Sequence, residues 1–231
     1  SIYNNHAILQ RHFANKLALI CSQSNIPKGL WLDFGSGTGL LSNALEELIP
    51  NQSVLRIDFS EKMLLKHHKK HKYILWDLNK GFPPVKDKPM LIASSFALHW
   101  LVDPAYRLKE WFNSLAPKGW IAIAVPINES FPEWRYAAKE AKVKFTAFSF
   151  PEQNSLLNNL PKNHVKYQHT FQYKQTSNNI FSLLKTIAKI GGNYTPHNPI
   201  GIGGWRSLKE NWPNAASNNK VELTWYIQII L

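Results

Sequence analysis

A glycine-rich segment, Asp33-Phe34-Gly35-Ser36-Gly37-Thr38-Gly39, lies between a predicted strand and a predicted helix. Glycines let the backbone approach a ligand closely, and a helix N-terminus attracts a carboxylate or a phosphate. The dinucleotide pattern G-x-G-x-x-G would require a glycine at position 40, where the chain has Leu40. No Lys-Ser/Thr pair follows, which excludes a phosphate-binding P-loop. The segment therefore predicts a site for a nucleotide-type ligand.

Three side chains farther along the chain fit an adenosine group. Asp58 ends the second predicted strand, where its carboxylate can accept hydrogen bonds from both ribose hydroxyls. A 2′-phosphate would be repelled there, which disfavours NADP. Asp77 ends the third predicted strand and can meet an adenine amino group, while Met63 can lie along the purine face. The alternative is that both aspartates cap loops and that Met63 belongs to the core.

The elements that must position these residues alternate regularly. Short apolar runs separated by helical patterns predict a parallel sheet that helices cover on both faces. The strands are expected at 30–34, 54–57, 73–76, 90–94 and 120–125, and the helices at 5–20, 40–48, from 60 onward and at 103–115.

The pattern changes after the fifth strand. Residues 126–163 are predicted to form a helical insertion, and 164–173 a strand. A helix is expected over 179–190, a turn-rich segment over 193–204, and a last strand over 221–231 that pairs antiparallel at the sheet edge.

Composition sets the limits within which function is sought. The 231 residues are 44% hydrophobic and 13% aromatic, which excludes a disordered chain. The single cysteine, Cys21, can form neither an internal disulfide nor a cysteine zinc site, which suits a reducing cytoplasm. No signal peptide is visible, and no apolar run approaches the ~18 residues of a membrane span. A cytoplasmic protein is expected.

The net charge is strongly positive, with 27 Lys and Arg against 15 Asp and Glu, or +12. Such a charge predicts an acidic partner, which could be nucleic acid, an anionic membrane or an acidic protein. Genome base bias explains the same composition without a partner. The densest run, His67-His68-Lys69-Lys70-His71-Lys72, is interpreted as the solvated end of a helix, because no carboxylate or cysteine beside it completes a metal site.

Four segments resemble the class I S-adenosylmethionine-dependent methyltransferases: 32–39, 57–64, 76–78 and 117–120. The resemblance implies an α/β, Rossmann-like fold with a central, mostly parallel seven-stranded sheet, helices on both faces and a helical insertion after strand five. It implies one domain over 1–231 and S-adenosyl-L-methionine as the cofactor. The cofactor-binding residues that it implies are Tyr3, Gln10, Asp33, Gly35, Ser36, Gly37, Gly39, Asp58, Phe59, Met63, Asp77, Leu78 and Ser94.

Further segments resemble one family within this class, the malonyl-acyl-carrier-protein O-methyltransferases of biotin synthesis. They are 3–7 with Gln10, 94–100, 131–134, 183–192 and 223–226. This likeness implies methyl transfer to the free carboxylate of malonyl-acyl carrier protein, under a mobile cover formed by a helix at about 1–22 and the insertion at about 126–163. The residues implied to line the acyl pocket are His99, Trp100, Phe131, Trp134 and Lys185.

A carboxylate acceptor requires no general base, because a carboxyl group of pKa near 4 is ionised at neutral pH. The resemblance therefore implies no certain catalytic residue, and catalysis would consist of orientation, an effect worth up to roughly 7–11 kcal/mol. An acidic acyl carrier protein would also fit the positive charge. The chain departs from the family in having His99 for Gln, Lys185 for Arg and Ala188 for Lys. A lysine is a point charge, which weakens any bidentate grip on a carboxylate.

Alternatives remain for the residues and for the function. His99 can be a hydrogen-bonded pocket wall, Trp100 and Trp134 packing residues, and Lys185 a solvated helix residue. The acceptor can be another small molecule, such as a quinone precursor or a small carboxylic acid. A nucleic-acid methyltransferase is disfavoured, because the amino-methylation, catalytic-cysteine and RNA-platform motifs are missing. A non-catalytic binding module is disfavoured by the intact glycines and Asp58.

Overall fold

The computed structural model describes residues 8–68, 71–158, 160–187, 200–213 and 220–231. These residues fall into two compact units. The larger unit contains 8–126, 151–170 and 228–231, and the smaller one contains described residues of 127–150 and 171–227. The glycine-rich segment and the five parallel strands belong to the larger unit.

A seven-stranded sheet has the order β3-β2-β1-β4-β5-β7-β6. Neighbouring strands from β3 to β5 all run parallel, as predicted. Leu231 and Tyr167 exchange two backbone hydrogen bonds, at 2.9 and 3.1 Å, which is the pattern of an antiparallel pair. The Lys166 N–H also donates to the Leu231 carbonyl, at 2.8 Å. The strands are β1 (Trp31–Phe34), β2 (Val54–Asp58), β3 (Tyr73–Leu75), β4 (Leu91–Ser95), β5 (Trp120–Pro126), β6 (Gln168–Ser177) and β7 (Val221–Ile230).

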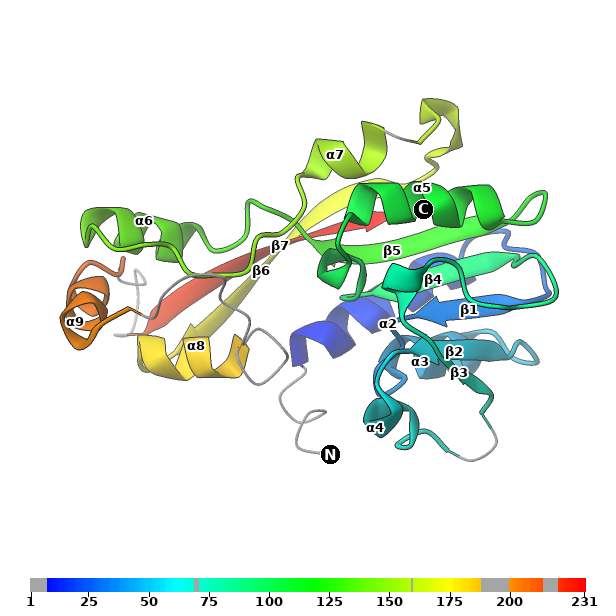
Figure 1. The fold of residues 1–231 in the computed structure, drawn as a ribbon, viewed down its shortest axis with the longest axis horizontal. Coiled ribbons are helices and arrows are strands. Elements are labelled where there is room, and N and C mark those ends of the chain that lie inside the picture. Colours follow the sequence, from blue (N-terminus) through cyan, green and yellow to red (C-terminus); the bar gives the residue numbers. More distant parts are fainter. Residues whose placement is uncertain (1–7, 69–70, 159, 188–199, 214–219) are drawn as a thin grey trace. The chain divides into compact units, whose positions relative to one another are not determined.

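Helices cover both faces of β1 because successive side chains of a strand point to opposite faces. The Phe34 ring packs edge-on against Trp111 of α5 (Pro104–Ser114), with ring centroids 4.8 Å apart. Asp33 points the other way and binds Ser42 of α3 (Leu40–Leu48). Helix α2 (Ile8–Ser22) packs on α3, so these two helices lie opposite α5 (Figure 1).

Short helical elements follow the strand ends. They include α4 (Glu61–Leu64) after β2, η1 (Leu78–Lys80) after β3 and η2 (Leu98–Trp100) after β4. The carboxylate of Asp103 caps α5 by accepting a hydrogen bond from the Tyr106 N–H at 2.9 Å. Because these strands run parallel, the helical elements that follow them begin at the same edge of the sheet. Ligands bind at this edge in folds of this type.

The smaller unit has an aromatic core. The Phe131 ring lies 4.6 Å from Trp225 and 5.6 Å from Phe150, and Trp134 packs against Phe145 at 5.4 Å. Besides parts of β6 and β7, this unit holds α6 (Pro132–Glu140), α8 (Ile180–Ile187) and α9 (Ile202–Glu210).

Two sequence predictions need correction. Strand β7 lies between β5 and β6 rather than at the edge, because side chains on both of its faces are buried, as in an interior strand. In the described part of the 126–163 segment, the helical elements are α6, α7 (Gln153–Asn158) and η3 (Lys162–His164), which agrees with the predicted helical insertion. Helix α9 occupies part of the predicted turn-rich segment, where Gly203-Gly204 indicated a turn but lie inside the helix.

Among the described helices, none is long and apolar enough to cross a membrane.

Candidate functional site

The glycine-rich segment between β1 and α3 adopts the backbone that only glycine takes readily. Gly35, Gly37 and Gly39 have φ angles of +70°, +52° and +84°. A Cβ on Gly35 would collide with the Cβ of Ala97, whereas one on Gly37 would meet nothing within 4 Å. The glycine loop, residues 35–39, is therefore packed at its start and open at Gly37.

Asp33, near the end of β1, bonds to the helix that follows the glycine loop. Its side chain is 1% exposed and accepts hydrogen bonds from the Ser42 N–H at 3.1 Å and the Ser42 hydroxyl at 2.5 Å. Burial raises the pKa of Asp33 to about 6, against the opposing effects of Ser42 and Arg56. The carboxyl group thus ties β1 to the first turn of α3 and so positions the loop.

The raised pKa makes a testable contribution to stability. Since the folded state holds the Asp33 proton more tightly than the unfolded state, this group lowers the free energy of unfolding as pH rises from about 4 to about 6. Asp33→Asn removes that titration but keeps an oxygen for Ser42. We expect the stability of the variant relative to wild type to rise across this window and to be constant above it. Urea unfolding at several pH values measures the difference, and a flat difference would contradict the assignment.

Asp58 lies beside the open part of the loop. Its carboxylate, 6% exposed, accepts hydrogen bonds from the Gly37 N–H and the Ser60 N–H, both at 2.8 Å. The structure thus brings together the glycine loop and the predicted ribose-binding aspartate. It also bears out the alternative that Asp58 caps a loop; contact with a ribose remains a prediction.

His67 is a residue of this site that the sequence reasoning missed. The run from His67 to Lys72 was expected to be a solvated helix end, but the half-buried His67 ring places Nε2 2.7 Å from the Gly37 carbonyl oxygen. Burial lowers its pKa. No motif in the sequence connects positions 37 and 67, so only the fold reveals this contact.

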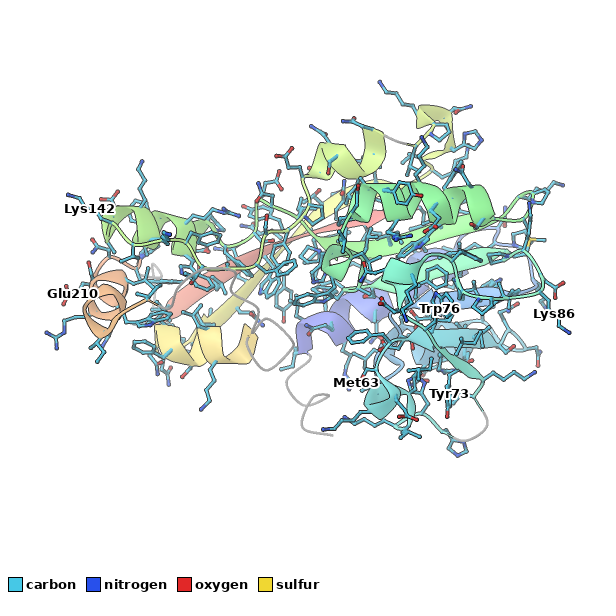
Figure 2. The ribbon with its side chains drawn as sticks, viewed as in Figure 1. Met63, Tyr73, Trp76, Lys86, Lys142 and Glu210 are labelled. Atoms are coloured by element: carbon cyan, nitrogen blue, oxygen red, sulfur yellow. The ribbon has the colours of Figure 1, made fainter. Side chains whose placement is uncertain are left out.

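The residues predicted for the adenine end differ in exposure. Phe59 is 77% exposed, Leu78 is 6% exposed, and the half-buried Met63 projects from α4 (Figure 2). Asp77 accepts a hydrogen bond from the Asn79 N–H at 2.9 Å, so it caps η1, as its alternative interpretation held. All four follow β2 or β3 in the chain, next to the Asp58 strand.

Two of the predicted cofactor-binding residues have a buried polar atom without a partner among the described residues. Ser94 is satisfied, because its hydroxyl donates to the Phe34 carbonyl at 2.8 Å. In contrast, Ser36 Oγ and Gln10 Oε1 are buried and find no hydrogen-bond partner among the described residues. A buried polar atom left unpaired costs about 1–3 kcal/mol, so these two atoms fit a polar ligand that would satisfy them. Tyr3 lies outside the described residues.

His99 follows β4 and is neutral. Its side chain is buried, which lowers its pKa to about 3, and its ring packs edge-on to Phe96 at 6.4 Å and against Trp100 at 4.8 Å. Phe96 has a φ of +56°, a conformation that is rare for bulky residues and that tends to occur at functional sites. Trp100 is 38% exposed. A neutral imidazole can donate a hydrogen bond to a carboxylate but cannot neutralise its charge.

The remaining predicted substrate residues belong to the smaller unit. Phe131 and Trp134 are 1% and 6% exposed inside its aromatic core, which agrees with a packing role, and Phe131 has a φ of +69°. Lys185 is exposed on α8, as its alternative interpretation held. Because His99 and Trp100 lie in the larger unit, a pocket shared by all five residues stays a prediction.

The chain is similar in sequence to known methyltransferases. The family model described as a methyltransferase domain matches residues 6–161. A malonyl-acyl-carrier-protein O-methyltransferase 2 of Coxiella burnetii is 28% identical over 58% of this chain and 55% of its own length. A protein with the same name from Ilyobacter polytropus is 23% identical over 96% and 89%. A trans-aconitate 2-methyltransferase of Variovorax paradoxus is 30% identical over 45% and 41%. The chain thus spans about half the length of several curated relatives that it matches.

Two solved structures share the fold. A methyltransferase structure from Bacillus halodurans superposes with a TM-score of 0.64 at 14% identity, covering 93% of this chain and 96% of that one. A plantazolicin methyltransferase in complex with SAH gives 0.51 at 15% identity, covering 98% and 87%. These likenesses confirm the predicted Rossmann-like methyltransferase fold.

Proposed function

Because the chain belongs to the family of methyltransferase domains, whose methyl donor is S-adenosylmethionine, we propose that it is a cytoplasmic enzyme that methylates the free carboxylate of malonyl-acyl carrier protein. The observation that carries the proposal is the likeness to two relatives of that name, one of which aligns along 96% of this chain. The family-like segments at 94–100, 131–134 and 223–226 support it.

The residues around the glycine loop fit the donor. Gly37 leaves open space, Asp58 supplies a carboxylate beside it, and Ser36 Oγ in the loop is a buried atom without a hydrogen-bond partner among the described residues. Gln10 Oε1 on α2 is likewise buried and without a partner among these residues. These residues would hold the adenosine and methionine parts, and the bound donor would supply an electrophilic methyl group. The methionine end would be placed by backbone N–H groups at the start of α3 and by these polar atoms.

The chain's own residues would act on the acceptor by orientation. A carboxylate of reference pKa near 4 is already the nucleophile at neutral pH, so no residue needs to remove a proton. His99 would donate one hydrogen bond from its neutral ring, and Phe96 and Trp100 beside it would exclude water. Steering of an acidic carrier protein would come from the net charge of +12.

This chemistry predicts a flat pH dependence. Both the acceptor carboxylate and His99, with a pKa of about 3, keep one protonation state above pH 6. We therefore expect the rate at saturating substrates to vary by less than about twofold between pH 6.5 and 8. Stopped assays of methyl-ester formation measure it. A tenfold rise through pH 7 would indicate a general base and would argue against a carboxylate acceptor.

The test of function compares acceptors directly. Purified protein is incubated with labelled S-adenosylmethionine and malonyl-acyl carrier protein, malonyl-coenzyme A or free malonate, and the product is identified by mass spectrometry. The proposal predicts a methyl ester on the carrier protein at a kcat/KM well above the other two. In parallel, the gene should restore growth without biotin to a bacterium lacking its malonyl-carrier-protein methyltransferase.

A second acceptor class has its own support. The trans-aconitate 2-methyltransferase relative is 30% identical over 45% of the chain, and trans-aconitate is a small carboxylic acid. Both classes present a carboxylate oxygen to the methyl group. Adding trans-aconitate to the same assay separates them, because preferential esterification of the free acid would replace the carrier-protein assignment.

A further inference from the structure

The peptide groups on both sides of Gly37 are held by side chains. The Gly37 N–H donates to Asp58 Oδ2 at 2.8 Å, and the Gly37 carbonyl oxygen lies 2.7 Å from His67 Nε2. A carbonyl can only accept, so the ring must carry its proton on Nε2 and donate it. Two side chains thus fix the orientation of Gly37, the residue of the loop where a Cβ would find open space.

We propose that His67 is a positioning residue of the cofactor site, which acts by fixing the glycine loop for S-adenosylmethionine. The peptide group is planar and trans, so holding the Gly37 oxygen toward His67 turns the Thr38 N–H to the opposite side. Asp58 fixes the preceding peptide group in the same way. The proposal rests on the cofactor site described above and names the residue that preorganises it.

The surroundings of His67 support a fixed position. Its backbone N–H donates to the carbonyl of Leu64 at 3.0 Å, and Leu64 is fully buried. A Cβ on Gly39 would lie 3.0 Å from His67 Cε1 and 3.5 Å from Arg56 Nε, so the ring lies against the loop backbone next to the buried guanidinium. The ring therefore cannot swing freely, and its hydrogen bond is available before any ligand arrives.

Preorganisation matters most in a glycine-rich loop. Glycine has the largest choice of backbone conformations, and ordering it during binding costs affinity. A side chain that orders Gly37 beforehand removes part of that cost. The effect should therefore appear in donor affinity, while the transfer step at saturating donor should not change.

Three variants separate hydrogen bonding from volume. His67→Leu keeps much of the bulk but cannot donate, His67→Gln keeps a donor, and His68→Ala changes the exposed neighbour. We expect His67→Leu to weaken binding of S-adenosylmethionine by about five- to tenfold, the worth of one net hydrogen bond. Its kcat and its KM for the acceptor should change by less than about twofold. His67→Gln should recover most of the affinity, and His68→Ala should bind as wild type.

Calorimetric titration with S-adenosylmethionine alone keeps this proposal separate from the proposed function, because no acceptor is involved. Failure of the wild type to bind would overturn the cofactor site and the role of His67 together. Equal binding by wild type and a folded His67→Leu would overturn the positioning role alone. A loss of affinity in His67→Leu that Gln does not restore would show that shape rather than hydrogen bonding matters, which also rejects the proposal.

A measurement on the wild-type protein covers the case in which His67→Leu does not fold. Nitrogen-15 NMR of the histidine rings should show His67 as the neutral tautomer protonated at Nε2, in the absence of ligand. A ring protonated at Nδ1 could not donate to the Gly37 carbonyl, and that result would reject the proposal by itself.

Discussion

Gly37→Asp should reduce the affinity for S-adenosylmethionine by about 100-fold or more and abolish methyl transfer, while the protein stays folded. A Cβ at this position meets no atom within 4 Å, so the new side chain would extend into the space proposed for the ligand. It would also place a second carboxylate near Asp58, whose Oδ2 already lies 2.8 Å from the Gly37 nitrogen. Aspartate is among the residues that best tolerate the φ of +52° found there.

The same substitution at Gly201 is a matched control. Gly201 also has open space around a Cβ, but it is exposed, precedes α9 and has a φ of −66°. Gly201→Asp should bind the donor as wild type does and can even cap α9. Titration calorimetry gives the affinities, and circular dichroism confirms folding. Normal donor binding by a folded Gly37→Asp would place the cofactor elsewhere.

Arg56→Met should lower the free energy of unfolding by about 3 kcal/mol. The guanidinium is fully buried and binds both oxygens of Glu46, at 2.9 and 3.2 Å, as well as Asn43 Oδ1 at 2.8 Å. Without the guanidinium, the carboxylate of Glu46, which lies on α3, loses its main partner. The loss should be visible as a lower urea midpoint with an unchanged slope.

A partly exposed pair on the same unit provides the comparison. Arg107 binds Glu110 one helical turn away at 2.8 Å, with both side chains partly in solvent. Arg107→Met should cost less than about 1 kcal/mol, because such pairs contribute little. The double change Arg56→Met with Glu46→Met should recover part of the first loss, since no charge is then left unpaired. If Arg56→Met and Arg107→Met lowered the free energy of unfolding equally, burial would not determine the contribution of the Arg56–Glu46 pair.

The sequence predicted those features that short-range patterns encode. The five parallel strands were found because each is an apolar run next to a turn, and the loop because three glycines follow β1 at two-residue spacing. Asp58 was found because it ends a strand adjacent to that loop, and the structure places it 2.8 Å from Gly37. In each case the signal lies within a few residues of the feature.

Features that depend on pairing across the chain were missed. The position of β7 inside the sheet follows from burial of both its faces, which an apolar C-terminal run does not distinguish from an edge strand. Helix α9 forms despite two glycines, whose helix cost of roughly 1 kcal/mol each must be offset by packing, as at the fully buried Leu208. The contact of His67 with Gly37 joins residues 30 positions apart and has no local signal.

The way in which side chains fix the backbone of the glycine loop affects how selective inhibitors could be designed. Asp33 binds Ser42 of α3, while Asp58 and His67 bind the peptide groups of Gly37, so all three side chains fix the backbone of the proposed donor site. Backbone looks alike in proteins with unrelated side chains, so a compound built only on the donor would be recognised by many transferases. An inhibitor would gain discrimination by extending toward His99, Phe96 and Trp100, the side chains proposed to contact the acceptor, whose rings pack on one another.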